Sequence, residues 1–337
     1  MAAARMGSVL AVSEGEKGSV AASRRRDVQV LRAVAVLLVV AFHAELPVPG
    51  GFVGVDVFFV ISGYVIVRGL LGELRSAGRV SFRTFYTRRA RRLLPLLAAC
   101  LVVTTLVSTM WLGGEAAERT ARTAAAAAVF NANTYLARQP VGYFDQDPTD
   151  NALLHTWSLS VEEQFYLVLP ALIVAAWVWG LRRGRERQAL ATVVVALAVG
   201  SLGLAWGLGA GRGERLTNLL GFTTGGTFEF FTAPARAWEF LIGVMLALGE
   251  RHLIRVPRPV RLLLGFVGAL LIAYSAFAFD GVDGFGPPQA LIPVVGAALV
   301  LLPGVEVVAP AGESKWRRRL AGPFVWIGDR GRVRWSV

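Results

Sequence analysis

The sequence predicts an all-α membrane protein, a polytopic transmembrane helix bundle of about 8–10 membrane helices. Composition is the first reason: 55% of the 337 residues are hydrophobic, 17% are charged and the mean hydropathy is +0.54, whereas soluble domains carry about 25% charged residues. The second reason is that apolar residues gather in blocks long enough to cross a bilayer, which needs about 20 residues per helix. The third is that arginine-rich runs separate these blocks, as expected for loops that fix the orientation of membrane helices.

Eight apolar blocks are candidate membrane helices. They lie at residues 30–46, 52–71, 93–112, 164–180, 189–209, 236–249, 262–279 and 289–304. Basic runs occur at residues 24–32, 68–92, 182–187, 251–261 and 315–319. Because positively charged loops remain in the cytoplasm, we expect these runs on the cytoplasmic side. The chain is therefore predicted to be a multi-pass protein of the plasma or inner membrane with a cytoplasmic N-terminus.

The connection at residues 113–158 tests this topology. Eight spans with cytoplasmic arginine runs require it to remain outside, although TAAAAAVFNANTYLA at 123–137 is helical in pattern and nearly long enough to span. We therefore expect an interfacial or re-entrant segment, which is tolerated where its backbone is buried in protein or lines a cavity. A ninth full span is the alternative.

The remaining features set the domain limits and exclude other classes. Residues 1–23 are rich in Ala, Gly and Ser and predict a disordered tail, residues 24–328 form the membrane domain, and residues 329–337 form a short atypical tail. Cys100 is the single cysteine, so neither a disulfide framework nor a cysteine metal site is expected. The formal charge of +12 is spread over short runs rather than one face, which argues against a nucleic-acid partner.

The first block contains Arg32 and His43, eleven residues apart in LRAVAVLLVVAFHA. Eleven steps of 100° bring two side chains to within about 20° of one helix face, roughly 16 Å apart along the axis. Ionisable groups inside a membrane segment mark candidate sites, and an imidazole is suited to remove a proton from an attacking hydroxyl. Both residues are therefore candidate catalytic residues, with His43 as the base. The alternative is that Arg32 extends to the interface and His43 satisfies a local hydrogen bond.

The second block adds Asp56, which lies in apolar surroundings on the same outer side as His43. Asp56 is a candidate to orient the imidazole of His43. The alternative is a structural acid at a helix N-terminus, where the helix dipole favours a carboxylate.

Four arginines precede the third block in RTFYTRRARRLLP: Arg88, Arg89, Arg91 and Arg92. Arginine binds phosphate through two parallel hydrogen bonds, and residues three apart share a helix face. Arg89 with Arg92, or Arg88 with Arg91, can therefore grip a phosphorylated donor such as acyl-CoA. A positive-inside anchor or an anionic-lipid contact is the alternative.

Polar residues also gather where later membrane helices begin. The segment LLHTWSLSVEEQFYLVLP carries His155, Trp157, Ser158, Glu162, Glu163 and Gln164. The adjacent carboxylates Glu162 and Glu163 are candidate catalytic groups, although a serine at 158 or 160 followed by a glutamate also resembles a capping box. Arg236 and Glu239, three residues apart at the start of the sixth block, predict an intrahelical ion pair.

Six segments taken in order resemble the acyltransferase family 3 membrane proteins, which include surface-glycan O-acetyltransferases and macrolide acyltransferases. They are DVQVLRAVAVLLVVAFHA, GGFVGVDVFFVISGYVI, FYTRRARRLLP, LLHTWSLSVEEQFYLVLP, RAWEFLIGVMLAL and GPFVWIGDR. Each is weak alone, but six in sequence, covering residues 26–328, are specific. The resemblance departs at Val30, where a glycine is usual, and at the final DRGRVRWSV, where relatives continue into a further helix.

The resemblance implies that Arg32 and His43 are the essential arginine and histidine of the first helix, and that an Arg-x-x-Arg pair lies within residues 88–92. It also implies cytoplasmic acyl-CoA as a co-substrate rather than a bound cofactor, with an acceptor on the outer side. The predicted function is transfer of an acyl group, with acetyl expected, to a hydroxyl of a cell-surface carbohydrate. The alternatives are a macrolide or other small-molecule acceptor, a truncated inactive remnant, and a transporter or lipid-binding membrane protein.

Overall fold

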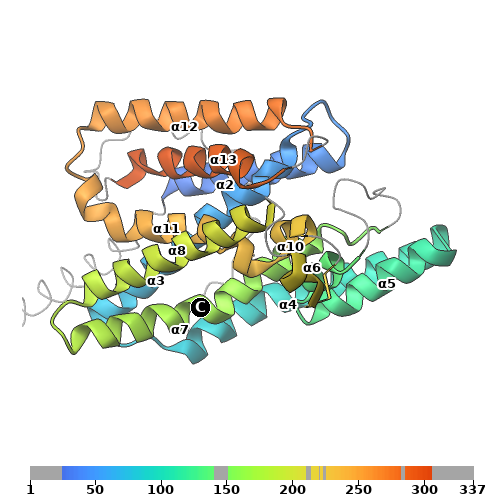
Figure 1. The fold of residues 1–337 in the computed structure, drawn as a ribbon, viewed down its shortest axis with the longest axis horizontal. Coiled ribbons are helices and arrows are strands. Elements are labelled where there is room, and N and C mark those ends of the chain that lie inside the picture. Colours follow the sequence, from blue (N-terminus) through green and yellow to red (C-terminus); the bar gives the residue numbers. More distant parts are fainter. Residues whose placement is uncertain are drawn as a thin grey trace, which may run out of the picture.

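The computed structural model describes residues 25–139, 151–209, 214–219, 221–222, 225–281 and 285–305 (Figure 1). The predicted tails at 1–23 and 329–337 and the GPFVWIGDR segment lie outside these residues. Within the described ranges the chain forms helices and turns and contains no strand. The predicted all-α bundle is therefore confirmed.

Each of the eight apolar blocks coincides with a helix. These helices are α2 (Arg26–His43), α3 (Gly54–Ala77), α4 (Phe82–Trp111), α7 (Thr156–Leu181), α8 (Glu186–Gly209), α11 (Ala233–Leu253), α12 (Arg258–Ala278) and α13 (Pro287–Leu301). Among the described residues, five segments are long and apolar enough to cross a membrane: Gly51–Ala77, Phe82–Trp111, Thr156–Leu181, Glu186–Leu208 and Arg258–Ala278. The chain is therefore a multi-pass membrane protein.

The connection after α4 differs from the expected single helix at 123–137. The chain forms α5 (Gly114–Ala128) and a short α6 (Ala132–Ala137), separated by a turn in which Phe130 has a φ of 55°. A left-handed backbone conformation at a non-glycine residue ends a helix. Neither helix is long enough to span a bilayer, so the ninth full span is contradicted. One face of α5 packs on α4, and the opposite face carries charged pairs such as Glu118 with Arg122.

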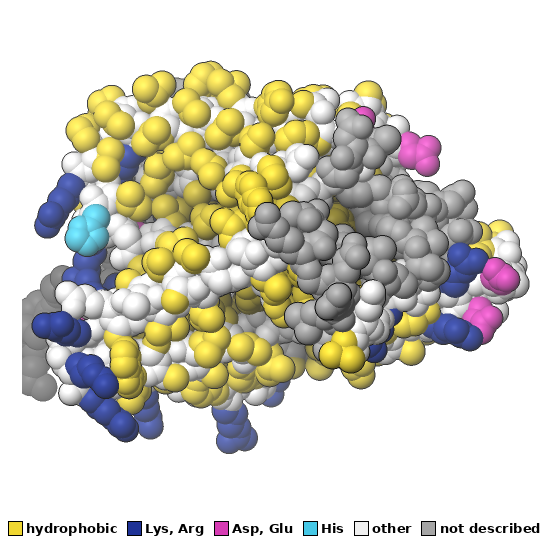
Figure 2. All heavy atoms as spheres, viewed as in Figure 1, with side chains coloured by type: hydrophobic (Ala, Val, Ile, Leu, Met, Phe, Trp, Pro, Cys, Tyr) yellow, Lys and Arg dark blue, Asp and Glu magenta, His cyan; other side chains and the backbone are white. Residues whose placement is uncertain are grey.

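Helix α3 is the centre of the bundle and α4 lies at its periphery. In the apolar window of α3, 72% of residues are buried inside the protein, against 17% for α4. Helix α3 packs against α2, α7, α11 and α13, and α11 in turn packs against α8. Apolar side chains cover much of the surface between the two ends of the bundle (Figure 2). On α12, Leu263 and Phe266 are more than half exposed, as expected for a helix that faces lipid.

The close approach of α3 and α11 depends on two glycines. A Cβ atom on Gly63 would overlap the carbonyl oxygen of Phe240, and one on Gly243 would overlap the carbonyl oxygen of Val60. Membrane helices associate through small residues that let two backbones meet. The two glycines therefore fix the distance between α3 and α11.

We expect Gly63→Ala to lower the free energy of unfolding by about 1–3 kcal/mol, because overpacking forces the two helices apart. Gly72→Ala is the matched control, since Gly72 lies on the same helix with open space around it and alanine is the better helix former by about 1 kcal/mol. Thermal unfolding in detergent measures both variants. Equal behaviour of the two would contradict the close contact.

The basic connections gather at one end of the bundle. Figure 2 shows Arg side chains at its left end, where α7 turns into α8 and α11 turns toward α12 (Figure 1). Arg75, Arg187 and Arg251 lie near the ends of three different helices, and Arg75 is close enough to the other two to interact electrostatically. The start of α2 is fastened at the same end, because Arg25 donates hydrogen bonds to Tyr64 and to the carbonyl of Leu301. We call this end the basic end.

Candidate functional site

Helices α2 and α7 bring the predicted site residues to two levels. His43 and His155 meet away from the basic end, with ring centroids 6.3 Å apart. Arg32 lies close enough to the Tyr166 hydroxyl to interact with it electrostatically. Eleven residues separate the two members on each helix, which corresponds to about 16 Å of rise. We call the histidine pair the outer level, and Arg32 with Arg89, Glu162, Glu163 and Tyr166 the inner level.

The outer level holds His43 in one tautomer. Its Nδ1–H donates a hydrogen bond to the carbonyl oxygen of Val39 at 2.8 Å, one turn earlier on α2. In the neutral ring Nε2 is then the atom with the free lone pair, as a general base requires. The side chain is exposed, so a substrate can reach Nε2.

His155 is the residue immediately before α7, and its imidazole is fixed in a similar way. The ring donates a hydrogen bond to the main-chain carbonyl of Ala152. Although part of the ring surface is accessible, the protein atoms around it, and then the nearby His43, lower the pKa of His155 below its usual range. His155 is therefore neutral at neutral pH.

Asp56 does not orient His43, contrary to the expectation from sequence. Its carboxylate accepts a hydrogen bond from Arg236 at 2.8 Å and is 1% exposed. Asp56 lies in the first turn of α3, which matches the alternative of a structural acid at a helix N-terminus. The Val39 carbonyl, four residues earlier on α2, takes the orienting role instead.

Arg236 is the centre of a buried cluster that joins α3, α7, α10 (Gly225–Phe231) and α11. The predicted intrahelical pair with Glu239 is present at 3.1 Å, and Glu239 is 0% exposed. Rings of Phe59, Trp157 and Phe230 surround the guanidinium at 5.5–5.8 Å. The pairing of Arg236 with Asp56 was not predicted, because the two residues are 180 positions apart.

Glu229 on α10 faces the same cluster and gives it a pH dependence. Burial raises the pKa of Glu229 from 4.5 to about 7, against the opposing effect of Arg236. Between these values the unfolded chain loses the proton while the folded chain keeps it, so stability falls as pH rises. We expect the loss to reach at most about 3 kcal/mol above pH 7, measured as thermal unfolding between pH 4.5 and 8. Glu229→Gln should remove this part of the pH dependence, and an unchanged profile would contradict it.

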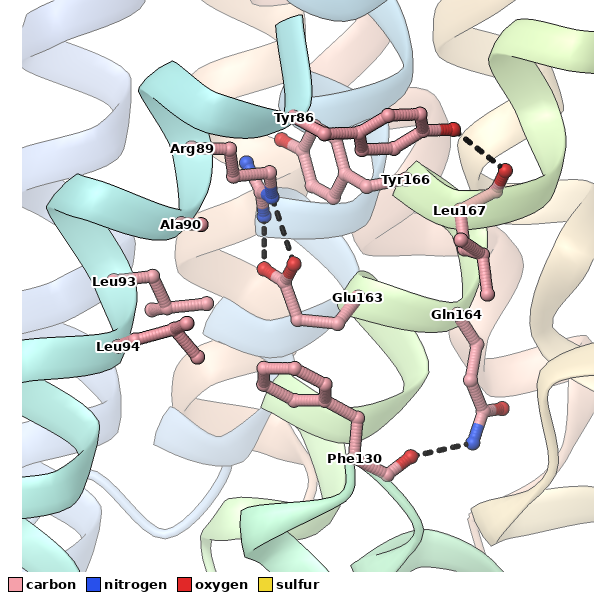
Figure 3. Close-up of a pocket in the computed structure, with 10 residues that line it drawn as sticks. All are labelled: Tyr86, Arg89, Ala90, Leu93, Leu94, Phe130, Glu163, Gln164, Tyr166 and Leu167. Carbon is pink, nitrogen blue, oxygen red and sulfur yellow. Dashed lines mark hydrogen bonds and ion pairs between the residues drawn. The ribbon is translucent and has the colours of Figure 1, made fainter. Parts of the chain in front are cut away.

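At the inner level, the adjacent glutamates Glu162 and Glu163 point to different helices. Glu163 forms a two-bond ion pair with Arg89 on α4, with one N–H···O distance of 2.8 Å (Figure 3). Glu162 accepts a hydrogen bond from Ser62 on α3 at 2.5 Å. The guanidinium of Arg89 also stacks on the Tyr166 ring, 3.1 Å from its centroid. Tyr166 was missed from sequence, although it lies three residues after Glu163 and hence on the same helix face.

A pocket of about 220 Å³ lies between α4 and α7 beside this ion pair (Figure 3). Tyr86 bridges the two helices by donating a hydrogen bond to the Leu167 carbonyl at 2.9 Å. The pocket is lined by Tyr86, Arg89, Ala90, Leu93, Leu94, Phe130, Glu163, Gln164, Tyr166 and Leu167. Apart from the ion pair its walls are largely apolar, so it suits an uncharged part of a ligand better than a phosphate.

The four arginines of α4 separate into two groups. Arg89 is turned inward to Glu163, whereas Arg88, Arg91 and Arg92 are exposed, and Arg88 lies 3.4 Å from Glu73. A phosphate bound by these exposed arginines would leave the Arg89–Glu163 ion pair intact. The grip on a phosphorylated donor therefore stays a prediction for Arg88, Arg91 and Arg92.

The predicted capping box in the α7 segment is wrong. Helix α7 begins at Thr156, and no side chain caps it. The Ser158 hydroxyl donates to the carbonyl of His155 at 3.2 Å, and the Ser160 hydroxyl donates to that of Thr156 at 3.1 Å. Both serines lie inside the helix because it starts earlier than expected. Trp157 is 2% exposed and packs in the aromatic core, which gives it a structural position.

Comparison with known proteins agrees with these features. The family described as "Acyltransferase domain" matches residues 25–329. The chain is 29% identical over 311 residues to peptidoglycan O-acetyltransferase OatA of Listeria monocytogenes, covering 89% of this chain and 46% of that protein. It is 33% identical over 219 residues to the putative peptidoglycan O-acetyltransferase YrhL of Bacillus subtilis, covering 65% of this chain and 32% of the relative. A putative O-acetyltransferase of Staphylococcus aureus is 32% identical over 218 residues, covering 64% and 33%.

The chain spans less than half the length of these curated relatives. No solved structure matches it. The family match extends from Arg25, just before α2, past the last described helix and includes the residues of both levels. The resemblance seen in the six sequence segments is therefore confirmed, and the chain belongs to the acyltransferase family.

Proposed function

We propose that this chain is a membrane O-acyltransferase that moves an acyl group, with acetyl as the expected group, from cytoplasmic acyl-CoA to a hydroxyl of a cell-surface carbohydrate. Family membership and the O-acetyltransferase relatives support the reaction class. The observation that carries the assignment is His43 at the end of the bundle opposite the basic end: its Nδ1–H is held by Val39, and Nε2 has no hydrogen bond to any residue that the structure describes.

In this reaction Nε2 of His43 takes the proton of the acceptor hydroxyl as its oxygen attacks the thioester carbonyl. The carbon–oxygen bond forms, and the tetrahedral intermediate then breaks its carbon–sulfur bond. The imidazolium returns the proton to the departing thiolate, so the products are the ester and CoA thiol. His43 ends in its starting state and no other reactant is needed.

The distribution of charge supports the direction of transfer. Basic loops remain in the cytoplasm, so the basic end is the cytoplasmic side and the outer level faces the opposite side. The exposed Arg88, Arg91 and Arg92 then lie nearer the side that holds acyl-CoA, where they are suited to its phosphates. Arg32 and Arg89 at the inner level lie between the donor side and His43, where Glu163 pairs with Arg89.

The test is direct transfer of label in reconstituted vesicles. The chain is given acetyl-CoA labelled in its acetyl group, with peptidoglycan fragments, simple glycosides and a macrolide as separate acceptors. We expect CoA release and appearance of label in a carbohydrate ester that alkali removes. Label in the macrolide alone would replace the carbohydrate with a small-molecule acceptor, and folded protein that transfers no label to any of them would overturn the proposal.

A further inference from the structure

The two imidazoles of the outer level are matched hydrogen-bond acceptors. His43 donates its ring N–H to the carbonyl of Val39, and His155 donates its own to that of Ala152. The ring N–H of each histidine is therefore already bonded to a main-chain carbonyl three or four residues earlier in the chain. In the neutral rings the second nitrogen of each is an acceptor, and the rings face one another nearly at right angles, at 82° and 6.3 Å between centroids.

A ligand that satisfies both ring nitrogens, one on His43 and one on His155, supplies two hydrogen-bond donors. One hydroxyl is the group that reacts, and the proposed function assigns it to His43. Hydroxyl groups on neighbouring carbons of a sugar ring place a second O–H within a few ångströms of the first. A substrate with only one hydroxyl would leave the second imidazole without a hydrogen-bond donor.

We propose that His155 accepts a hydrogen bond from the hydroxyl next to the one that His43 deprotonates, so that this site selects acceptors with two neighbouring hydroxyl groups. This role rests on the proposed function, and it narrows the substrate of that reaction to carbohydrates with two neighbouring hydroxyl groups. It makes His155 a residue that binds and positions the acceptor rather than a second base.

Three observations agree with this role. The lowered pKa of His155, caused by the protein atoms around the ring and then by His43, keeps the ring neutral and hence an acceptor. Both histidines are exposed, so a ligand reaches them without a rearrangement. Next to His43, the half-buried ring of Phe42 packs edge-to-face against it at 5.4 Å, which adds an apolar contact beside the imidazole.

The experiment compares two acceptors and four proteins in lipid. The acceptors are a methyl glycoside with two neighbouring hydroxyls and the same glycoside with one of the two replaced by hydrogen. The proteins are the unmodified chain, His155→Ala, His155→Gln and His252→Ala, whose histidine lies at the exposed end of α11 by the basic end. Transfer kinetics and the acceptor-induced shift in thermal unfolding are measured for each, with CoA binding as the check of folding.

For His155→Ala we expect KM for the diol to rise about 3- to 10-fold, the range for one lost neutral hydrogen bond, with kcat and CoA binding unchanged. KM for the deoxy acceptor should not change. His155→Gln should recover part of the loss because its amide oxygen accepts a hydrogen bond, and His252→Ala should resemble the unmodified chain.

An equal loss for both acceptors, or a loss confined to kcat, would overturn the role of His155 while leaving the proposed function in place. The thermal shift decides the case even without turnover, because a diol that stabilises the chain no better than its deoxy analogue also overturns it. Failure of the proposed function is distinguishable, since it would appear as absence of transfer by the unmodified chain with either acceptor.

Discussion

The His43→Ala variant is expected to transfer acyl groups about 10²- to 10⁴-fold more slowly than the unmodified chain, the usual contribution of a general base. The variant lacks Nε2, the atom that takes the proton of the attacking hydroxyl. The neighbouring imidazole of His155 is a poor replacement, because its lowered pKa makes it a weaker base. The measurement is initial rate of label transfer from acetyl-CoA at saturating acceptor.

The control for this variant is His252→Ala, which removes an exposed histidine from the far end of the bundle and should leave the rate unchanged. His43→Ala should also bind CoA normally, since the exposed arginines of α4 are untouched. Unimpaired transfer by a folded His43→Ala protein would remove His43 from the mechanism and with it the main support for the proposed reaction site.

The second large effect is expected on stability. Arg236→Ala should lower the free energy of unfolding by about 3–5 kcal/mol, the cost of removing one partner from a buried ion pair. The carboxylates of Asp56 and Glu239, which are 1% and 0% exposed, would be left without the guanidinium that lies within 3.1 Å of both. Three aromatic rings would also lose their shared contact. Chemical or thermal unfolding in detergent measures the change.

Two further variants show how much of the stability lost in Arg236→Ala comes from unpaired charge and how much from lost packing. Arg122→Ala breaks an exposed pair with Glu118 on α5 and should cost less than about 1 kcal/mol. Replacing all three charged groups together, as Arg236→Met with Asp56→Asn and Glu239→Gln, removes the uncompensated charge and should be less destabilised than Arg236→Ala alone. A triple variant that is worse than the single variant would show that packing, not charge, holds the cluster together.

The helices could be predicted because their causes are local. A run of apolar residues needs no partner to prefer lipid, and its backbone satisfies itself within the run, so all eight blocks coincide with helices. The break at Phe130 was not predicted, because the alanine-rich sequence before it favours a continuous helix, whereas Phe130 itself packs against side chains of α4 and α7.

Some features of the candidate site could likewise be predicted from the sequence, and others could not. Arg32 and His43 were found because both lie on one face of one helix, and their spacing is a property of the helix alone. The partner of Asp56 was not found, because the nearest candidate in sequence was His43, whereas the true partner, Arg236, lies 180 residues away on α11. The pairing of Arg89 with Glu163, 74 residues apart, likewise could not be read from the two motifs taken separately.

The sequence by itself determined the membrane character, the positions of the helices, the family and the identity of the polar residues that the bundle must accommodate. Only the tertiary structure decided how those residues are paired: Glu163 with Arg89, Glu162 with Ser62, Asp56 with Arg236, and His43 beside His155. The reason is that lipid selects each helix for its own composition, whereas a buried charge or imidazole is satisfied by whichever group the packing of α2, α3, α4, α7 and α11 brings within hydrogen-bonding distance.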